Sequence, residues 1–322
     1  MKAIVYDRYG SPDVLELQEI DTPVAKDDQV LVRVHAASVN PLDWHRMRGE
    51  PWFMRGSEGL TKPKNTGLGA DVAGRVEAVG RNVTQVQPGD EVFGMSIRTL
   101  AEYVAVSDEG VVPKPANLTF EEAAAVPVAA LTALQGLRDK GGIQPGQKVL
   151  INGAAGGVGT FAVQIAKSFG ADVTGVCSAR NVELVRSIGA DNVIDYTQED
   201  FTRGGQRYDL ILDAVGNRSL SAIRRALKPD GTLALAGAAK GRSGGRPVLF
   251  LLRAVLLRRF VSQTLVTYLA QRSRDDLVRL KELIEAGTVT PVIDRHYPLS
   301  EVAEAIRYLE AGHAQGKVVI TV

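Results

Sequence analysis

The sequence predicts an α/β protein of two units, a β-rich unit and a unit with a doubly wound parallel sheet. Its 322 residues suggest two domains, at roughly 150 residues each. Short apolar runs separated by Gly, Pro and Asp recur over residues 1–120, whereas strand-like and helix-like runs alternate over residues 148–237. A glycine-rich turn at residues 153–159 joins the first strand of the alternating part to a helix, which is typical of nucleotide-binding proteins.

The first part of the chain is expected to form a barrel-like or sandwich-like unit, because many short strands alternate with turn signals. Its expected strands are Lys2–Asp7, Val14–Asp21, Gln29–Ser38, Asp71–Gly80, Glu91–Gly94, Ala101–Val106 and Val111–Lys114. The stretch from Arg46 to Gly69 is rich in Gly, Pro and charge and is expected to be a long loop. Loops of this length in a compact domain are often functional.

The sequence pattern changes after Pro115, from short strand-like runs to a helical tract followed by alternating strands and helices. Thr119 is expected to cap a helical tract that runs to about Arg138, since acidic residues follow it in the first turn. The strands expected next are Lys148–Asn152, Val173–Cys177, Asn192–Asp195, Tyr208–Asp213 and Thr232–Gly237. Three helices are expected between them: Gly157–Phe169, a helix that contains Val182, Val185 and Ile188, and Ser219–Leu227. This alternation implies a parallel sheet covered on both faces.

The tail is expected to pack on the N-terminal unit, because its last strand needs a neighbouring strand with which to pair its backbone groups. Its expected elements are a strand Gln263–Leu269, a helix Asp275–Ala286 with Gly287 at C′, a helix Ser300–Ala311 capped by Ser300 and followed by Gly312, and a strand Lys317–Val322. The predicted domains are therefore residues 1–120 with 271–322, and residues 121–270.

Composition excludes several kinds of partner and site. With 38 Lys and Arg against 37 Asp and Glu, nothing in the charge predicts nucleic acid or an anionic membrane as partner. The apolar stretch Pro247–Leu257 is broken by Arg253 and is shorter than the roughly 20 residues that cross a bilayer. A buried helix is favoured there over a surface-lying one, and the role of the 239–260 segment stays open.

One cysteine excludes an intrachain disulfide and a four-thiolate zinc site. Together with a strand-like N-terminus, the low cysteine count predicts a cytoplasmic protein.

The glycine-rich turn predicts a dinucleotide site. Small residues are needed where the chain turns, where its backbone approaches the pyrophosphate and where the helix meets the strand, and Ala154, Gly156 and Gly159 fall on those positions. Ala154 replaces the usual first glycine. Together with Gly157 and Val158, these residues would present the helix N-terminus to the pyrophosphate. A turn required only for tight packing is the alternative.

The second strand of this unit favours NADPH over NADH. It ends in Ser178, Ala179, Arg180 and Asn181, without the acidic residue that would bind the 2′-hydroxyl of the adenosine ribose. Ser178 and Arg180 would instead bind a 2′-phosphate. Alternatively, Arg180 is a solvated residue at a helix start. Cys177 is expected to be a small packing residue.

Motifs along the whole chain resemble the medium-chain dehydrogenase/reductase superfamily. The resemblance is greatest to its zinc-free quinone oxidoreductase branch, including reticulon-4-interacting-protein-like members. The motifs are Ala36–Asp43, Gly69–Val76, Pro88–Gly94, Ala101–Tyr103, Ala123–Pro127 with Thr132 and Ala133, Asn152–Gly159, Val292–Arg295 and Gly316–Val319. The resemblance implies a GroES-like catalytic domain, an inserted Rossmann domain, a cofactor cleft between them and hydride transfer from the nicotinamide.

The resemblance also implies a site without metal. Zinc-dependent relatives place a cysteine where Asn40 stands and a His-Glu pair where Ala70 and Asp71 stand. The four histidines His35, His45, His296 and His313 are scattered along the chain. Without a Lewis acid, alcohol oxidation is a poor fit, whereas reduction of a quinone or an α,β-unsaturated carbonyl needs only hydride transfer and donors for the developing oxyanion.

By resemblance, Asn40 and Asp43 lie at the nicotinamide and substrate pocket, and Thr132 touches the nicotinamide. Asn40 would donate to a carbonyl or to the carboxamide. Asp43 would orient a neighbour or water, or else cap the turn after Pro41, and Thr132 is alternatively an ordinary buried helix threonine. Trp44 and Trp52, with Phe53, would line an aromatic pocket for a planar substrate, or else serve only in packing. His45 is a candidate proton donor, or else a surface histidine of the loop.

Further cofactor contacts are expected at the carboxyl ends of the parallel strands, where such sheets bind ligands. They are Tyr196, Val215, Gly216, Gly237, Ala238 and, on the last strand, Lys317, which is alternatively a surface lysine. The segment Gln263–Leu269 resembles an edge strand through which the family often dimerises, so a homodimer is expected. A monomer whose edge is covered by Val248–Phe260 is the alternative.

The sequence thus predicts an NADPH-dependent, zinc-independent oxidoreductase acting on a quinone or an α,β-unsaturated carbonyl. A metal-free alcohol or aldehyde oxidoreductase and a catalytically silent NADPH-binding protein are the alternatives. The physiological substrate is not predicted.

Overall fold

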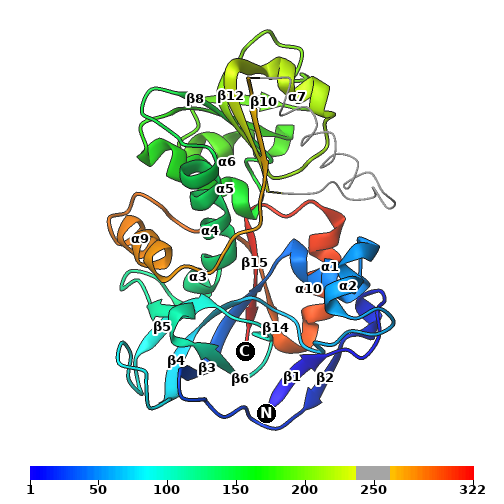
Figure 1. Cartoon of the computed structure of the whole chain (residues 1–322), viewed down its shortest axis with the longest axis vertical. Helices are drawn as coiled ribbons and strands as arrows, with labels where there is room; N and C mark the ends of the chain where they lie inside the picture. The colour runs from blue at the N-terminus through cyan, green and yellow to red at the C-terminus, as the bar shows by residue number, and fades with distance from the viewer. Residues whose placement is uncertain (237–261) are drawn as a thin grey trace. The chain divides into compact units, whose positions relative to one another are not determined.

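The computed structural model describes residues 1–236 and 262–322. The chain divides into two compact units (Figure 1). Unit 1 comprises Met1–Val128, Arg272–Gly287 and Pro291–Val322, and unit 2 comprises Ala129–Gln271 and Thr288–Thr290. A β-rich unit and a unit with a doubly wound parallel sheet confirm the predicted α/β class. The boundaries expected at residues 120 and 270 stay a prediction.

Unit 1 is built on a seven-stranded sheet in the order β14-β15-β3-β4-β5-β7, in which β6 also pairs with β3. Its strands are β3 (Gln29–Val39), β4 (Asp71–Val79), β5 (Glu91–Met95), β6 (Tyr103–Ser107), β7 (Val111–Pro113), β14 (Ile293–Pro298) and β15 (Lys317–Thr321). The 11-residue β3 is long enough to pair with β6 along its first half and with β15 along its last residues. A separate two-stranded sheet joins β1 (Lys2–Val5) to β2 (Glu16–Glu19), which the 3-10 helix Pro12–Val14 precedes.

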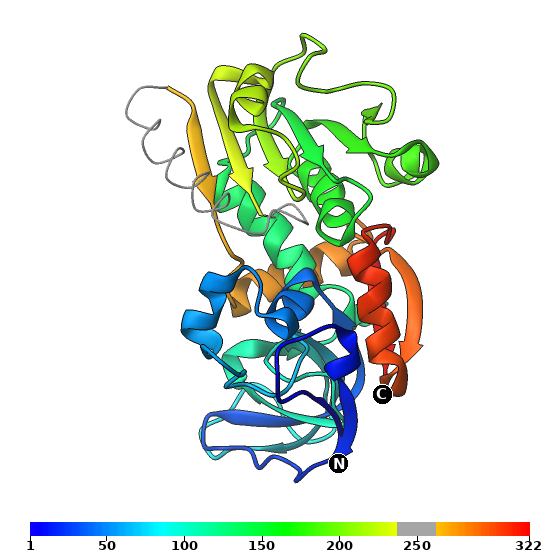
Figure 2. The same cartoon turned by 90° about the vertical axis from the view of Figure 1, so that its right-hand side faces the viewer.

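The tail contributes two helices and two strands to unit 1. As expected of a terminal strand, β15 finds a sheet and pairs antiparallel with β3. The helix α9 (Arg274–Glu285) contacts β7, and α10 (Val302–Ala311) contacts β14 and β15. Figure 2 shows α10 in red beside the orange strand β14. Gly287 and Gly312 follow these helices with φ of +70° and +76°, values that favour glycine. Ser300 is not the cap of α10, because a 3-10 turn, Leu299–Glu301, precedes the helix and puts Glu301 at the N-cap.

The expected loop from Arg46 to Gly69 is wrong in part. The helix α1 (Pro41–Arg48) runs into it, and a 3-10 turn (Trp52–Met54) and the short α2 (Arg55–Glu58) follow. Helix α1 has clear end signals: Pro41 is its first residue, and Gly49 ends it with φ of +62°. Its sequence lacks an apolar stripe, so hydrophobic periodicity did not reveal it.

Unit 2 contains a six-stranded, fully parallel sheet in the order β10-β9-β8-β11-β12-β13. Its strands are β8 (Lys148–Asn152), β9 (Asp172–Cys177), β10 (Asn192–Asp195), β11 (Tyr208–Asp213), β12 (Leu227–Leu235) and β13 (Thr264–Thr267). Helix α5 (Gly157–Ser168) contacts β8 and β9, α6 (Val182–Ser187) contacts β9 and β10, and α7 (Leu220–Ala226) contacts β12. The strand order reverses between β8 and β11, and such switch points bind ligands in doubly wound folds.

The helical tract after Thr119 is divided into α3 (Phe120–Ala124), α4 (Pro127–Gln135) and a π-helical turn, Gly136–Lys140. The expected cap is confirmed. The Thr119 hydroxyl accepts from Glu122 N at 3.2 Å, and the Glu122 carboxylate accepts from Thr119 N at 2.8 Å. Because Pro127 cannot donate a backbone hydrogen bond, it separates α3 from α4. The remaining 3-10 turns are Asp108–Gly110 and Ala179–Asn181.

Several predictions fall outside the described residues: the cofactor contacts of Gly237 and Ala238, the end of the strand Thr232–Gly237, and the 239–260 segment with Pro247–Leu257 and Val248–Phe260. Among the residues that are described, no helix is long and apolar enough to cross a membrane.

Candidate active site

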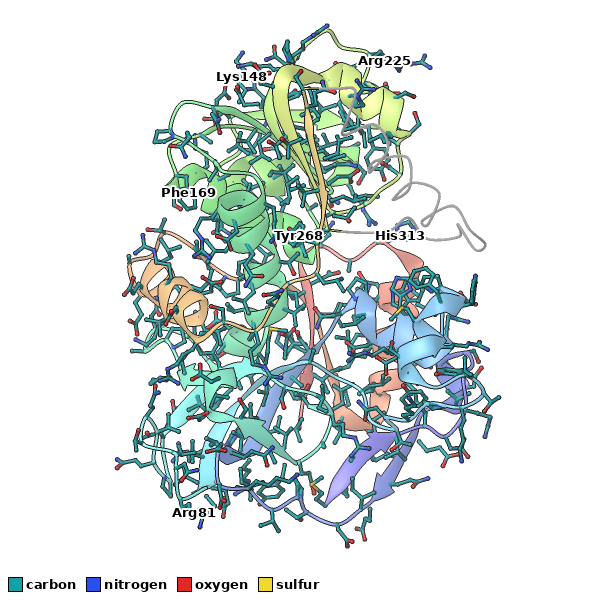
Figure 3. The ribbon with its side chains drawn as sticks, in the orientation of Figure 1. Arg81, Lys148, Phe169, Arg225, Tyr268 and His313 are labelled. Atoms are coloured by element: carbon teal, nitrogen blue, oxygen red, sulfur yellow. The ribbon has the colours of Figure 1, made fainter. Side chains whose placement is uncertain are left out.

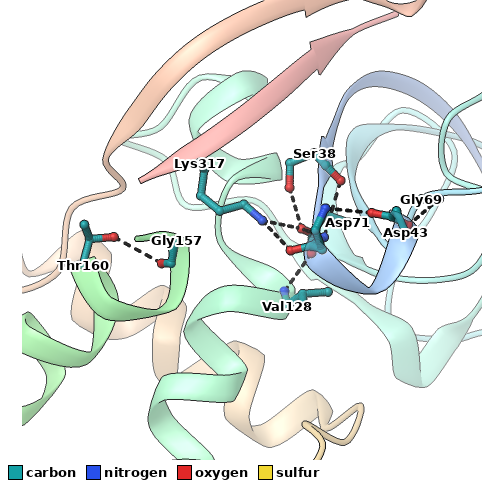
Figure 4. Close-up of polar contacts among 9 residues, drawn as sticks. Ser38, Asp43, Gly69, Asp71, Val128, Gly157, Thr160 and Lys317 are labelled. Atoms are coloured by element: carbon teal, nitrogen blue, oxygen red, sulfur yellow. Dashed lines mark hydrogen bonds and ion pairs between the residues drawn. The ribbon is translucent and has the colours of Figure 1, made fainter. Parts of the chain in front are cut away.

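Three adjacent strands of unit 1 bring four polar side chains together. Ser38 lies near the end of β3, Asn40 directly follows that strand, Asp71 starts β4 and Lys317 starts β15. The antiparallel register places Ser38 opposite Asp71 and Val39 opposite Val318. All four side chains are buried, with residue exposures between 0 and 4%. We call them the Asn40 cluster, and Figure 4 labels three of its members, Ser38, Asp71 and Lys317.

The Asp71 carboxylate is the centre of the Asn40 cluster. Its Oδ2 accepts from Ser38 Oγ at 2.5 Å, from Asn40 Nδ2 at 2.8 Å and from Lys317 Nζ at 3.1 Å. Its Oδ1 accepts from the Val128 backbone N–H in the first turn of α4 at 2.7 Å. A buried carboxylate is costly unless it is paired and hydrogen-bonded, and this one is both.

Lys317 lies on the strand where the sequence placed it, and its ammonium is bound within unit 1. Besides the contact with Asp71, Nζ donates to Asn40 Oδ1 at 2.6 Å. The alternative of a surface lysine is wrong, because the residue is 3% exposed. A contact between Lys317 and the cofactor stays a prediction.

Asp43 lies beside this cluster, in the first turn of α1, and is 1% exposed. Its two carboxylate oxygens accept from backbone N–H groups, Oδ2 from Asn40 at 2.7 Å and Oδ1 from Gly69 at 3.0 Å. Burial raises the pKa of Asp43 to about 6, and the two backbone hydrogen bonds oppose that rise. This geometry is the turn-capping arrangement that the sequence left open beside an orienting role.

The aromatic residues expected at the substrate lie in two places. Trp44 is buried and stacks on His45, with ring centroids 3.6 Å apart, whereas Trp52 is 70% exposed. The Glu50 carbonyl can only accept a hydrogen bond, so His45 Nδ1, 2.8 Å away, carries the proton of the neutral ring. Burial lowers the pKa of His45, and Nε2 is therefore an acceptor at neutral pH. Proton donation from Nε2 would first require a second proton on the ring.

The glycine-rich turn lies where the sequence placed it, between β8 and α5. Gly153 and Ala154 both donate their N–H to the Val176 carbonyl, at 3.1 and 3.0 Å, which ties the turn to β9. A Cβ on Gly159 would lie 2.0 Å from the Gly153 carbonyl oxygen, so only glycine fits there. At Gly156, the N-cap of α5, a Cβ would meet only that oxygen, at 3.4 Å, so the turn leaves space beside it.

Alanine at position 154 fits because its neighbour on β9 is also small. A Cβ on Gly175 would lie 2.4 Å from Val185 Cγ1 and 3.0 Å from the Ala154 Cβ. The missing methyl group of Gly175 therefore makes room for Val185 and for the extra methyl group of Ala154. The pair accounts for a departure from the usual glycine pattern that the sequence alone left unexplained.

The residues expected at the adenosine end follow β9 and β10. Ser178 to Asn181 follow β9, and Tyr196 N–H donates to the Cys177 carbonyl at 3.0 Å, which brings Tyr196 beside them. Arg180 is exposed, and Asn181 is 7% exposed. Burial raises the pKa of the Cys177 thiol to about 11, which fits the expected packing role.

Sequence reasoning missed the site role of two polar residues at the switch point, Asn152 at the end of β8 and Asp213 at the end of β11. Asp213 ends β11, and its Oδ1 accepts from Asn152 Nδ2 at 2.8 Å, from Val215 N at 3.0 Å and from Gly216 N at 2.8 Å. This carboxylate shapes the loop that carries the predicted contacts Val215 and Gly216. A polar residue ending each of two adjacent buried strands was the signal that would have found them.

Thr132 is buried in α4, and its carbonyl accepts from the Tyr268 hydroxyl at 2.7 Å. Tyr268, labelled in Figure 3, directly follows β13, and burial raises its pKa. Gln135 and Gln271 add a reciprocal pair, with Gln271 N–H bonded to Oε1 at 2.9 Å and the Gln271 carbonyl to Nε2 at 2.8 Å. Sequence reasoning missed Tyr268, because the contact joins residues 136 positions apart.

Within residues 1–236 and 262–322, no three or more His, Cys, Asp and Glu side chains gather in a way that could hold a metal ion. His35 stacks on Phe120 with ring centroids 4.4 Å apart. The cysteine lies in unit 2, away in sequence from the Asn40 cluster.

Comparison with known proteins gives two family matches. Residues 26–116 match the alcohol dehydrogenase GroES-like domain, and residues 188–320 match a family described as zinc-binding dehydrogenase. Among curated proteins, the chain is 36% identical to the mouse mitochondrial NAD(P)H oxidoreductase RTN4IP1, over 100% of this chain and 89% of that protein. It is also 36% identical to the chloroplastic NADPH-dependent alkenal/one oxidoreductase of Arabidopsis thaliana, over 99% of this chain and 79% of that protein.

Solved structures agree with these matches. The quinone oxidoreductase of Coxiella burnetii superposes with a TM-score of 0.87 at 32% identity, over 100% of this chain and 99% of that one. The Escherichia coli quinone oxidoreductase in complex with NADPH gives a TM-score of 0.86 at 25% identity, over 100% of both chains.

The predicted cytoplasmic location is contradicted by these relatives, since the mouse protein is named mitochondrial and the Arabidopsis protein chloroplastic. The prediction rested largely on the single cysteine. A low cysteine count argues against an oxidising compartment, and it does not separate the cytosol from the reducing interior of an organelle.

Proposed function

The chain belongs to the quinone oxidoreductase-like branch of the medium-chain dehydrogenase/reductases, and from this premise we propose that it transfers hydride from NADPH to a quinone or an α,β-unsaturated carbonyl without zinc. That it is an NAD(P)H-dependent oxidoreductase follows from relatives that match it along nearly its whole length. The choice of cofactor, the independence from zinc and the class of acceptor are the parts that we propose.

The glycine-rich turn is the observation that carries the proposal. The chain's turn residues Ala154, Gly156, Gly157, Val158 and Gly159 would hold the pyrophosphate, since the space beside Gly156 and the first N–H groups of the 12-residue α5 suit an anion. When bound, NADPH supplies the hydride. The loop 214–216, held by Asp213, would border the nicotinamide ribose.

Preference for NADPH rests on the end of β9. No acidic residue follows this strand directly, and the exposed Arg180 supplies a guanidinium that suits a 2′-phosphate. Ser178, Asn181 and Tyr196 complete the proposed adenosine contacts, since the backbone bond from Tyr196 to Cys177 joins the two strand ends.

Independence from zinc rests on the residues at the Asn40 cluster. A zinc site needs thiolate, imidazole or carboxylate ligands, and the cluster offers an amide, a hydroxyl, an ammonium and a carboxylate that already has four donors. The family name zinc-binding dehydrogenase describes the matched family as a whole and assigns no ligand in this chain. In the proposed reaction, hydride adds to the electron-poor carbon, Asn40 donates to the developing oxyanion, and a solvent proton completes the reduction.

The function is tested by stopped-flow oxidation of NADPH bound to chelator-treated protein, with zinc content measured on the same sample. We expect rapid oxidation by quinones or enones, little by saturated aldehydes and no dependence on added zinc. Turnover confined to aldehydes would indicate a metal-free alcohol or aldehyde oxidoreductase. Tight NADPH binding without turnover would indicate a silent binding protein, and stoichiometric zinc required for turnover would refute the metal-free proposal.

We also propose a homodimer formed through β13. This strand ends the sheet order and pairs only with β12 among the described residues, so its outer edge offers unpaired backbone groups. Sedimentation at micromolar concentration should therefore give twice the 34.5 kDa chain mass. A single 34.5 kDa species would contradict this assembly.

A further inference from the structure

The Asn40 side-chain amide is held at both ends by charged groups. Its oxygen accepts from the Lys317 ammonium at 2.6 Å, and its nitrogen donates to the Asp71 carboxylate at 2.8 Å. A flipped amide would face its N–H groups toward the ammonium and its oxygen toward the carboxylate, both of which are repulsive. The ion pair therefore permits one orientation of the amide.

This orientation leaves one N–H of Asn40 weakly engaged. Among the residues that the structure describes, the other acceptor of Nδ2 besides Asp71 is the Ser38 carbonyl oxygen, which lies 3.5 Å away, at the outer limit of a hydrogen bond. The ammonium on the amide oxygen draws electron density from the nitrogen, which makes that N–H a stronger donor. A group of this kind, fixed in advance and poor in protein acceptors, suits an oxygen on which negative charge develops.

Lys317 has little freedom to act elsewhere. It is the first residue of β15, its backbone N–H is bonded to the Val292 carbonyl at 2.8 Å, and its side chain is 3% exposed. By the resemblance, zinc-dependent relatives place a cysteine at position 40 and a His-Glu pair at positions 70 and 71. In this chain, Asn40 and Asp71 instead both bind the Lys317 ammonium.

We propose that Lys317 and Asp71 are positioning residues, whose buried ion pair orients and polarises the Asn40 amide so that its second N–H donates to the carbonyl oxygen of the acceptor. This inference rests on the proposed function. The ion pair acts through Asn40, so its contribution to turnover should vanish when Asn40 is absent.

The test is a double-mutant cycle with Lys317→Met and Asn40→Ala in chelator-treated protein. Lys317→Met should lower kcat by about 100-fold, the scale of a misplaced reacting group. The KM for NADPH should change little if Lys317 acts through Asn40, whereas a direct contact of Lys317 with the cofactor would raise that KM. In the Asn40→Ala background the same substitution should change kcat far less. Equal losses in both backgrounds would overturn the inference, because Lys317 would then act independently of Asn40.

Two further variants separate positioning from stability. Lys317→Met leaves Asp71 buried without its counter-charge, which is destabilising; the double variant Lys317→Met with Asp71→Asn removes both charges. We expect this double variant to recover the thermal midpoint but not kcat. Ethylammonium should restore turnover of Lys317→Ala, and tetramethylammonium, which has no N–H, should not. Recovery of kcat by the charge-free double variant would show a merely structural role.

A readout independent of turnover keeps the inference testable if no acceptor is found. In protein labelled with ¹⁵N-asparagine, the Asn40 side-chain N–H that donates to Asp71 should exchange slowly with solvent, and Lys317→Met should accelerate that exchange. Wild-type protein without turnover would refute the proposed function only. Unchanged amide exchange in Lys317→Met would refute the positioning role whatever the activity.

Discussion

Replacing Gly159 with alanine should destabilise unit 2 by about 3 kcal/mol, at the upper end of overpacking costs, and abolish NADPH binding. The added Cβ would lie 2.0 Å from the Gly153 carbonyl oxygen and 2.7 Å from the Ala154 Cα. Both atoms belong to the backbone, so no side-chain rotation relieves the contact, and the turn or the start of α5 must shift. Thermal unfolding and fluorescence titration with NADPH measure the two effects.

Gly156→Ala is the matched control in the same turn. Gly156 has φ of −84°, which alanine adopts, and an added Cβ would approach only the Gly153 carbonyl oxygen, at 3.4 Å. We expect a stability loss below about 1 kcal/mol, because alanine is a poorer N-cap than glycine. NADPH binding should still weaken, since the methyl group would occupy the space proposed for the pyrophosphate. Normal NADPH affinity in Gly156→Ala would show that the cofactor does not approach this turn.

The second large effect is expected at Arg180. Loss of a hydrogen bond to a charged group costs about 1.5–3 kcal/mol, so Arg180→Ala should raise the Kd for NADPH by about 10- to 150-fold. The Kd for NADH should change little, because NADH has no 2′-phosphate. Direct titration of both cofactors into the wild-type and variant proteins gives the two ratios.

Arg186→Ala provides the control for general loss of positive charge. Arg186 lies on α6 near the same strand end in sequence, and its guanidinium pairs with Glu183 at 2.9 Å. This variant should keep the ratio of the two cofactor affinities. If Arg180→Ala weakens NADPH and NADH equally, the arginine does not bind the phosphate, and the alternative of a solvated surface residue holds.

Most of the unit 2 strands could be predicted because they are short apolar runs bounded by turn residues. Strand β12 starts at Leu227, five residues before the predicted Thr232, because the sequence Lys-Pro-Asp-Gly inside it is typical of a turn. The predicted bounds of β8, β10 and β11 agree with the structure to the residue. Helix α1 and strand β14 could not be predicted in this way. The sequence of β14 is Ile-Asp-Arg-His-Tyr-Pro, and it forms the end strand of its sheet, so neither continuous burial nor clear alternation marks it.

The candidate site was only partly predictable for a related reason. Asn40 and Lys317 were singled out, but the contact of Lys317 with Asp71 joins residues 246 positions apart. It depends on the order β15-β3-β4, which no local pattern contains. The same holds for Tyr268 and Thr132, which meet only once β13 and α4 are placed in unit 2.

The central claim, metal-free hydride transfer to a conjugated acceptor, is tested most directly by isotope transfer. Chelator-treated protein is mixed in a single turnover with an enone and NADPH that carries deuterium at the transferable C4 position. We expect a saturated ketone with one deuterium at the carbon β to the carbonyl, without added zinc. Deuterium at the carbonyl carbon of an alcohol product, or transfer that begins only after zinc is added, would contradict the account.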